Sequence, residues 1–138
     1  MRVYRHGTDA GAVRLMASVK GKHKAGAQNV EVRLHKRHPG QVAIASHPAR
    51  FRVVMCGRRW GKSACGIREA CDAAIAGQPV GWFAPTYNLA LEAWRELVER
   101  LAPITARMNE QDKRLELVTG GIVEIWTLDT PDAARGRK

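Results

Sequence analysis

The chain is poor in the features that define several specialised classes of protein. Its 138 residues include three cysteines, without the spacing of a metal site or a disulfide framework, so neither a zinc finger nor a disulfide scaffold is expected. Apolar runs are only a few residues long, far short of the ~20 residues of a membrane-spanning helix. The first ten residues carry Arg2, Arg5 and His6 and no apolar stretch, so no secretory signal is expected. These absences favour one small cytosolic domain without a membrane partner.

Acidic residues are also scarce, and their scarcity is local. The chain has 23 Lys and Arg against 13 Asp and Glu, a formal net charge of +10. Residues 1–50 hold 10 of the basic and 2 of the acidic side chains, whereas residues 51–138 hold 13 and 11. Residues 1–28 therefore resemble a basic, flexible arm. Translation would start at Met1 or at Met16. The lysines of this arm suit nucleic-acid phosphates, and a solvated tail is the alternative. Residues 29–138 form the expected folded unit.

The spacing of apolar residues in this unit predicts an α/β order. Strands follow from alternation or from short buried runs, and helices from apolar residues that recur every three or four positions. In chain order, we first expect a strand over 30–34, a helical turn after Pro39-Gly40, and a strand over 51–56 that is buried on both faces. A helix from 62 to 77 and a strand over 80–83 follow. The last elements are a helix capped by Thr86 or Asn88 and ended by Pro103, and a hairpin of 115–117 with 122–128 about Gly120-Gly121.

The segment between the expected buried strand and the first long helix reads Cys56-Gly57-Arg58-Arg59-Trp60-Gly61-Lys62-Ser63. This is the position and the composition of a phosphate-binding loop. Gly61 lets phosphates approach the backbone, Lys62 would reach the β- and γ-phosphates, and Ser63 would ligate Mg²⁺. Cys56 stands where the strict pattern has glycine. An ordinary basic turn is the alternative, but it explains neither Gly61 nor Lys62 at a helix start.

A longer series of motifs resembles the large subunit of tailed-phage terminases, a family that tolerates small residues at the place of Cys56. The resemblance covers about residues 30–138. It rests on Leu34-His35, Pro39-Gly40-Gln41, Ala49-Arg50-Phe51-Arg52-Val53-Val54, the loop Gly57 to Ser63, Phe83-Ala84-Pro85-Thr86-Tyr87, Trp94, Leu128-Asp129-Thr130-Pro131-Asp132 and Arg135-Gly136. It implies a P-loop NTPase-type fold, with a mostly parallel sheet and flanking helices, that binds ATP and Mg²⁺.

The resemblance also implies roles for single residues. Gln41 corresponds to the glutamine that reads adenine, and a surface glutamine is the alternative. The loop Gly57, Arg58, Arg59, Trp60, Gly61, Lys62 and Ser63 would hold the nucleotide. The resemblance gives catalytic roles to Lys62 and to Arg58, the arginine that contacts the γ-phosphate, for which Arg59 is the alternative. Arg135 would be an arginine finger that one subunit of a homo-oligomer gives to its neighbour.

An acidic strand is missing after Ser63. Hydrolysis in this class needs four apolar residues followed by Asp-Glu, and no such run occurs. Ile125 to Asp129 comes nearest, but Thr127 interrupts it, no Glu follows, and we interpret Asp129 as a strand-end residue. The carboxylates of the family's nuclease domain are absent too. The expectation is thus an incomplete ATPase domain, as in a prophage remnant or a split gene.

Two functions follow from this sequence. The first is an ATP-binding fragment of a terminase, whose intact form packages double-stranded DNA with a small terminase subunit and a portal ring in the bacterial cytoplasm. The second is a non-catalytic basic module that binds DNA or a partner and keeps the loop only as a scaffold.

The missing Asp-Glu pair generates the first prediction. The 138-residue chain should release no phosphate from ATP above background, even with Mg²⁺ and DNA, because nothing completes the metal shell or orients the attacking water. Phosphate release by the purified chain measures this. Turnover that Lys62→Ala abolishes would contradict the prediction and assign the missing role to Asp129 or Glu124.

Overall fold

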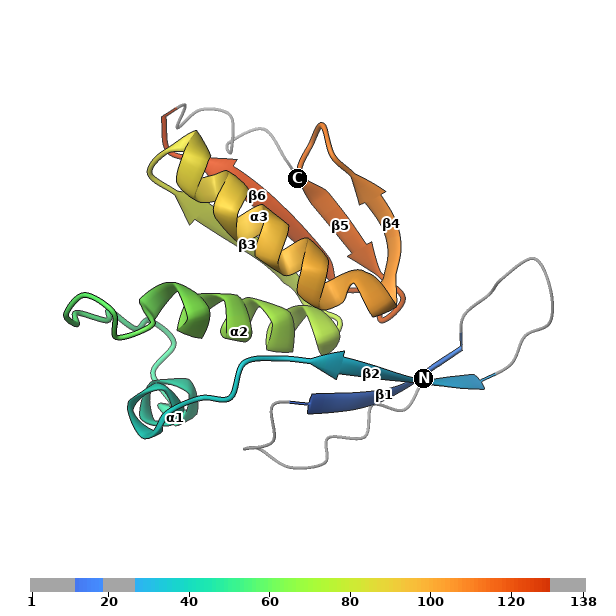
Figure 1. Ribbon diagram of the computed structural model, residues 1–138, viewed down its shortest axis with the longest axis horizontal. Coiled ribbons are helices and arrows are strands. Elements are labelled where there is room, and N and C mark those ends of the chain that lie inside the picture. The colour runs from blue at the N-terminus through green and yellow to red at the C-terminus, as the bar shows by residue number, and fades with distance from the viewer. Residues whose placement is uncertain (1–11, 19–26, 130–138) are drawn as a thin grey trace.

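The computed structural model describes residues 12–18 and 27–129, which form three α-helices, a short 3₁₀ helix and two β-sheets (Figure 1). The bounds of the elements, in chain order, are β1 (Ala12–Ser18), β2 (Ala27–Arg33), α1 (Pro39–Ser46), α2 (Lys62–Ile75), β3 (Pro79–Ala84), α3 (Tyr87–Leu101), η1 (Ala102–Ile104), β4 (Thr105–Asn109), β5 (Arg114–Leu117) and β6 (Ile122–Thr127). The α/β class expected from the sequence is confirmed.

The larger sheet has the strand order β3-β6-β5-β4. Only β3 and β6 run parallel, and the other two pairs are antiparallel, so the expectation of a mostly parallel sheet is wrong for the described residues. Short turns join β4 to β5 and β5 to β6, and such turns can connect only antiparallel neighbours. The β5–β6 pair is the hairpin expected near the end of the chain.

The core lies between this sheet and the two long helices, with α3 across β3 and β6 in Figure 1. Alternate residues of β5 and β6 are buried, whereas their neighbours are partly exposed. The helices contribute the apolar faces that the sequence predicted. The principal buried side chains are Ile67, Cys71 and Ile75 of α2, Trp94, Leu97 and Leu101 of α3, and Leu115, Leu117, Val123 and Ile125 of the sheet.

The buried strand predicted over residues 51–56 is absent from the structure. The segment has no strand, and Phe51, Val53 and Met55 are 83%, 90% and 93% exposed. A strand buried on both faces needs a neighbour to pair its N–H and C=O groups. Among the described residues no strand pairs with this segment, so its apolar side chains face solvent.

Residues 12–18 lie inside the segment expected to be a flexible arm, but they form β1, which pairs antiparallel with β2. The strand expected over 30–34 corresponds to β2, although β2 begins earlier, at Ala27. The polar composition of residues 17–29 predicted an arm. A strand such as β2 needs a second strand to pair with, and Ala12–Ser18 form that strand.

The ends of the helices only partly follow their predicted caps. Gly77 ends α2 as expected, with φ +84 and its N–H bonded to the carbonyl of Ala74. At the start of α3, Thr86 occupies the N-cap but its side chain makes no capping hydrogen bond, and Asn88 lies within the helix. No helix in the described part of the chain is long and apolar enough to cross a membrane.

The close approach of α2 to the β5–β6 turn generates a stability prediction. A Cβ at Gly121 would lie 2.0 Å from the carbonyl oxygen of Ala74, so Gly121→Ala must displace backbone. We expect the free energy of unfolding to fall by about 3 kcal/mol. Gly57→Ala is the control, because nothing lies within 4 Å of its Cβ position. Equal urea midpoints for the two variants would contradict the packing described.

Candidate phosphate-binding site

The loop that precedes α2 owes its shape to two residues with positive φ. Gly61, the N-cap of α2, has φ +88, a conformation that glycine adopts without steric cost. Arg59 has φ +63, which is unusual for a residue with a side chain. The chain therefore turns sharply over Arg58 and Arg59 and then enters the helix at Lys62. The predicted order of loop and helix is confirmed, although no strand lies directly before the loop, where residues 51–56 were expected to form one.

The first turn of α2 is open to an anion. No side chain caps this end of the helix, and its first turn holds no acidic residue. Lys62 and Ser63 are both exposed there. Because the first N–H groups of a helix have no partner within it and carry partial positive charge, this end of α2 suits a phosphate group.

Lys62 bends back over the loop. Its Nζ donates hydrogen bonds to the carbonyl oxygens of Cys56 (3.0 Å) and Gly57 (3.2 Å). The ammonium thus lies against the backbone that a bound phosphate would approach. Among the described residues no ion pair joins Lys62, Arg58 or Arg59 to a carboxylate. The loop is therefore a concentration of positive charge.

The structure brings Gln41 to this loop from the helix α1. Gln41 is 6% exposed, its Nε2 donates to the carbonyl of Gly61 (3.1 Å), and its Oε1 accepts from the N–H of His38 (3.3 Å). His38 also reaches the loop, with Nε2 3.1 Å from the carbonyl oxygen of Trp60 and its ring edge-on to the indole. Sequence reasoning missed His38, although its position before Pro39 is a helix-cap signal.

A network of ion pairs holds the chain that leads into α1. Arg37 bonds to Glu69 and to Asp72 (2.7 Å) of α2, and Arg68 bonds to Asp72 (3.1 Å). Burial alone lowers the pKa of Arg37, but the hydrogen bonds and charges of Asp72 and Glu69 outweigh it, so this pKa is raised. Arg37 stays charged, and α2 fixes the segment just before α1. The sequence offered no signal for this network.

The remaining predicted residues have no described contact with the loop. Arg135 lies outside the described residues. Glu124 pairs with Arg114 (2.8 Å), and Asp129 is exposed beyond the end of β6. The strand that carries Glu124 is one arm of the hairpin, as the sequence predicted. Gly57 to Ser63 and Gln41 are thus the predicted residues that come together.

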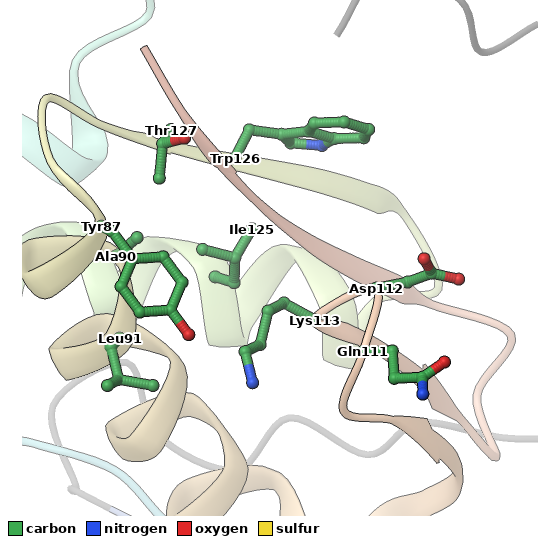
Figure 2. Close-up of a pocket in the computed structure, with 9 residues that line it drawn as sticks. All are labelled: Tyr87, Ala90, Leu91, Gln111, Asp112, Lys113, Ile125, Trp126 and Thr127. Carbon is green, nitrogen blue, oxygen red and sulfur yellow. The ribbon is translucent and has the colours of Figure 1, made fainter. Parts of the chain in front are cut away.

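A separate cavity of about 260 Å³ lies between the start of α3, the β4–β5 turn and β6. Figure 2 shows the side chains of Tyr87 and Leu91 on one side, with Ile125 and Lys113 across from them. Lys113 has φ +48, and its ammonium lies over the ring of Trp94 at 5.6 Å. None of the residues that line this cavity belongs to the loop.

Comparisons with protein-family models, with curated proteins and with solved structures give no match. The geometry of the loop and its motifs therefore carries the functional inference.

The three thiols differ sharply in their surroundings. Cys56 is half-buried beside the loop, whereas Cys65 and Cys71 are buried in α2. Burial raises the pKa of Cys65, and it raises that of Cys71 from 9.0 to about 12. Because the folded state holds the Cys71 proton more tightly, the stability this group contributes is complete below pH 9 and is lost as the pH rises toward 12.

We therefore predict that iodoacetamide at pH 8 modifies Cys56 first in the folded protein, since the raised pKa keeps Cys71 protonated and both buried sulfurs are shielded. Mass spectrometry of the digested protein identifies the modified residues. Cys56→Ser should remove the early adduct, and all three thiols should react in denaturant. Native modification of Cys71 at the rate of Cys56 would contradict the burial of α2.

Proposed function

We propose that the chain binds the phosphates of a nucleoside triphosphate together with Mg²⁺, as a P-loop NTPase-type domain of a terminase large subunit. The single observation that carries this is the loop before α2. It combines a glycine of φ +88, an uncapped helix start and a lysine that bends back over the loop carbonyls. An ordinary turn has no need of this combination.

The chemistry of the loop suits such a ligand. The Lys62 ammonium now bonds to two neutral carbonyl oxygens, and charged phosphate oxygens would be stronger acceptors. Arg58 and Arg59 are exposed and can fork onto phosphate oxygens, so either supplies the γ-phosphate arginine. Ser63, on the first turn of α2, offers a hydroxyl to Mg²⁺.

The segment that leads into the loop is apolar and exposed. Phe51, Val53 and Met55 have no apolar cover, although this segment leads directly into the loop. The edge of β3 opposite β6 also pairs with no other described strand. Exposed apolar side chains therefore lie directly before the loop in the described part of the chain.

The order of motifs extends the proposal to DNA packaging. In the intact protein, ATP hydrolysis would drive double-stranded DNA into a procapsid, with a small terminase subunit and a portal ring as partners, several copies acting together, and Arg135 serving as the arginine finger. A non-catalytic basic module is the second candidate. The excess of basic side chains in residues 1–50, 10 against 2 acidic ones, supports this candidate, because such charge suits nucleic-acid phosphates.

The role of the loop generates a binding prediction. Lys62→Ala should weaken binding of a fluorescent ATP analogue at least about tenfold, because the loss of one charged hydrogen-bond donor leaves phosphate oxygens unpaired. Lys36→Ala removes the same charge from an exposed position outside the loop and should bind as the wild type does. Equal affinities of Lys62→Ala and the wild type would contradict the loop assignment.

A further inference from the structure

Gln41 is already fully engaged in the ligand-free site. Its Nε2 donates to the carbonyl of Gly61, and its Oε1 accepts from the N–H of His38 in a capping-box arrangement at the start of α1. To read adenine, a 6% exposed amide would have to give up both bonds. Because the exchange replaces two hydrogen bonds with two others, it offers little net preference for one base.

The contact between Gln41 and Gly61 is close enough to constrain both residues. A Cβ at position 61 would lie 2.9 Å from Nε2 of Gln41, so a larger residue there would have to displace the amide from its present position. The carbonyl of Gly61 also accepts the N–H of Cys65 (2.9 Å), the first hydrogen bond of α2. One oxygen therefore joins α1, the loop and α2.

Two further contacts tie the start of α1 to the end of the loop. Nδ1 of His38 accepts the N–H of Gly40, so its Nε2 carries the proton and donates to the carbonyl of Trp60. The ring of Trp60 lies 3.2 Å from the Cβ position of Gly40. α1 is anchored in turn by Arg52, which donates to the carbonyl of Ile44 (2.6 Å), and by the Arg37 ion pairs before it.

We infer that Gln41 is a positioning residue that holds the Trp60-Gly61 end of the loop, and that the site recognises a polyphosphate without selecting the base. This inference rests on the proposed function and names its ligand class as a triphosphate chain. Phosphates meet Lys62, Ser63 and the loop backbone, whereas the described part of the site has no free amide for a purine edge. Substitution of Gln41 should therefore weaken every triphosphate equally.

The binding test compares ATP, GTP and inorganic tripolyphosphate, each titrated with Mg²⁺ against the wild type and Gln41→Met. Wild-type affinities for ATP and GTP should agree within about threefold, and Gln41→Met should weaken all three ligands by the same factor, about tenfold. Gln111→Met on the β4–β5 turn is the matched control and should change nothing. Loss of ATP binding alone, with GTP and tripolyphosphate unchanged, would overturn the inference and make Gln41 an adenine reader.

A second measurement needs no ligand. Hydrogen exchange of the Cys65 amide, which shares the Gly61 carbonyl with Gln41, should quicken about tenfold in Gln41→Met while the amides in the middle of α3 keep their wild-type rates. Unchanged exchange at Cys65 would overturn the positioning role. If the wild type binds none of the three ligands, the proposed function fails, and the exchange rates still decide the role of Gln41. If Gln41→Met does not fold, His38→Ala, which removes the Trp60 contact, is measured by the same exchange and titrations with the same expected outcomes.

Discussion

The carbonyl oxygen of Gly61 accepts hydrogen bonds from two directions, and the geometry of the site depends on this oxygen. The N–H of Cys65 binds it from within α2, and the amide of Gln41 binds it from α1. Gly61 adopts its φ of +88 without steric cost, and a Cβ at this position would lie 2.9 Å from Nε2 of Gln41. A larger residue at position 61 would displace the Gln41 amide, and α1 would lose this hydrogen bond to the loop.

The core and the loop are joined by the same helix. The inner face of α2 packs Ile67 and Cys71 against the sheet and α3, whereas Glu69 and Asp72 hold Arg37 and so the approach to α1. The loop thus precedes a helix with two different faces: one packs into the core, and the other carries the carboxylates that bind Arg37. Removal of one carboxylate would leave a mostly buried guanidinium with fewer acceptors, which is costly, and the disturbance would reach Gln41 through α1.

Much of the fold was predictable because local patterns decide helices and hairpins. The apolar spacing that includes Trp94 and Leu97 predicted α3, and Gly120-Gly121 predicted the turn between β5 and β6. Residues 51–56 show where local patterns fail. Their apolar run predicted a buried strand, but a strand also requires a partner, and a partner is a property of the assembled sheet.

The sequence by itself predicted the position of the loop, since Gly61, Lys62 and Ser63 are adjacent in the chain. It also placed Gln41 near the loop, although only by resemblance. The tertiary structure decided what Gln41 touches, because that depends on the packing of α1 against residues 20 positions away. It likewise decided that Arg37 faces Glu69 and Asp72, since ion pairs between separate elements form only when the elements meet in space.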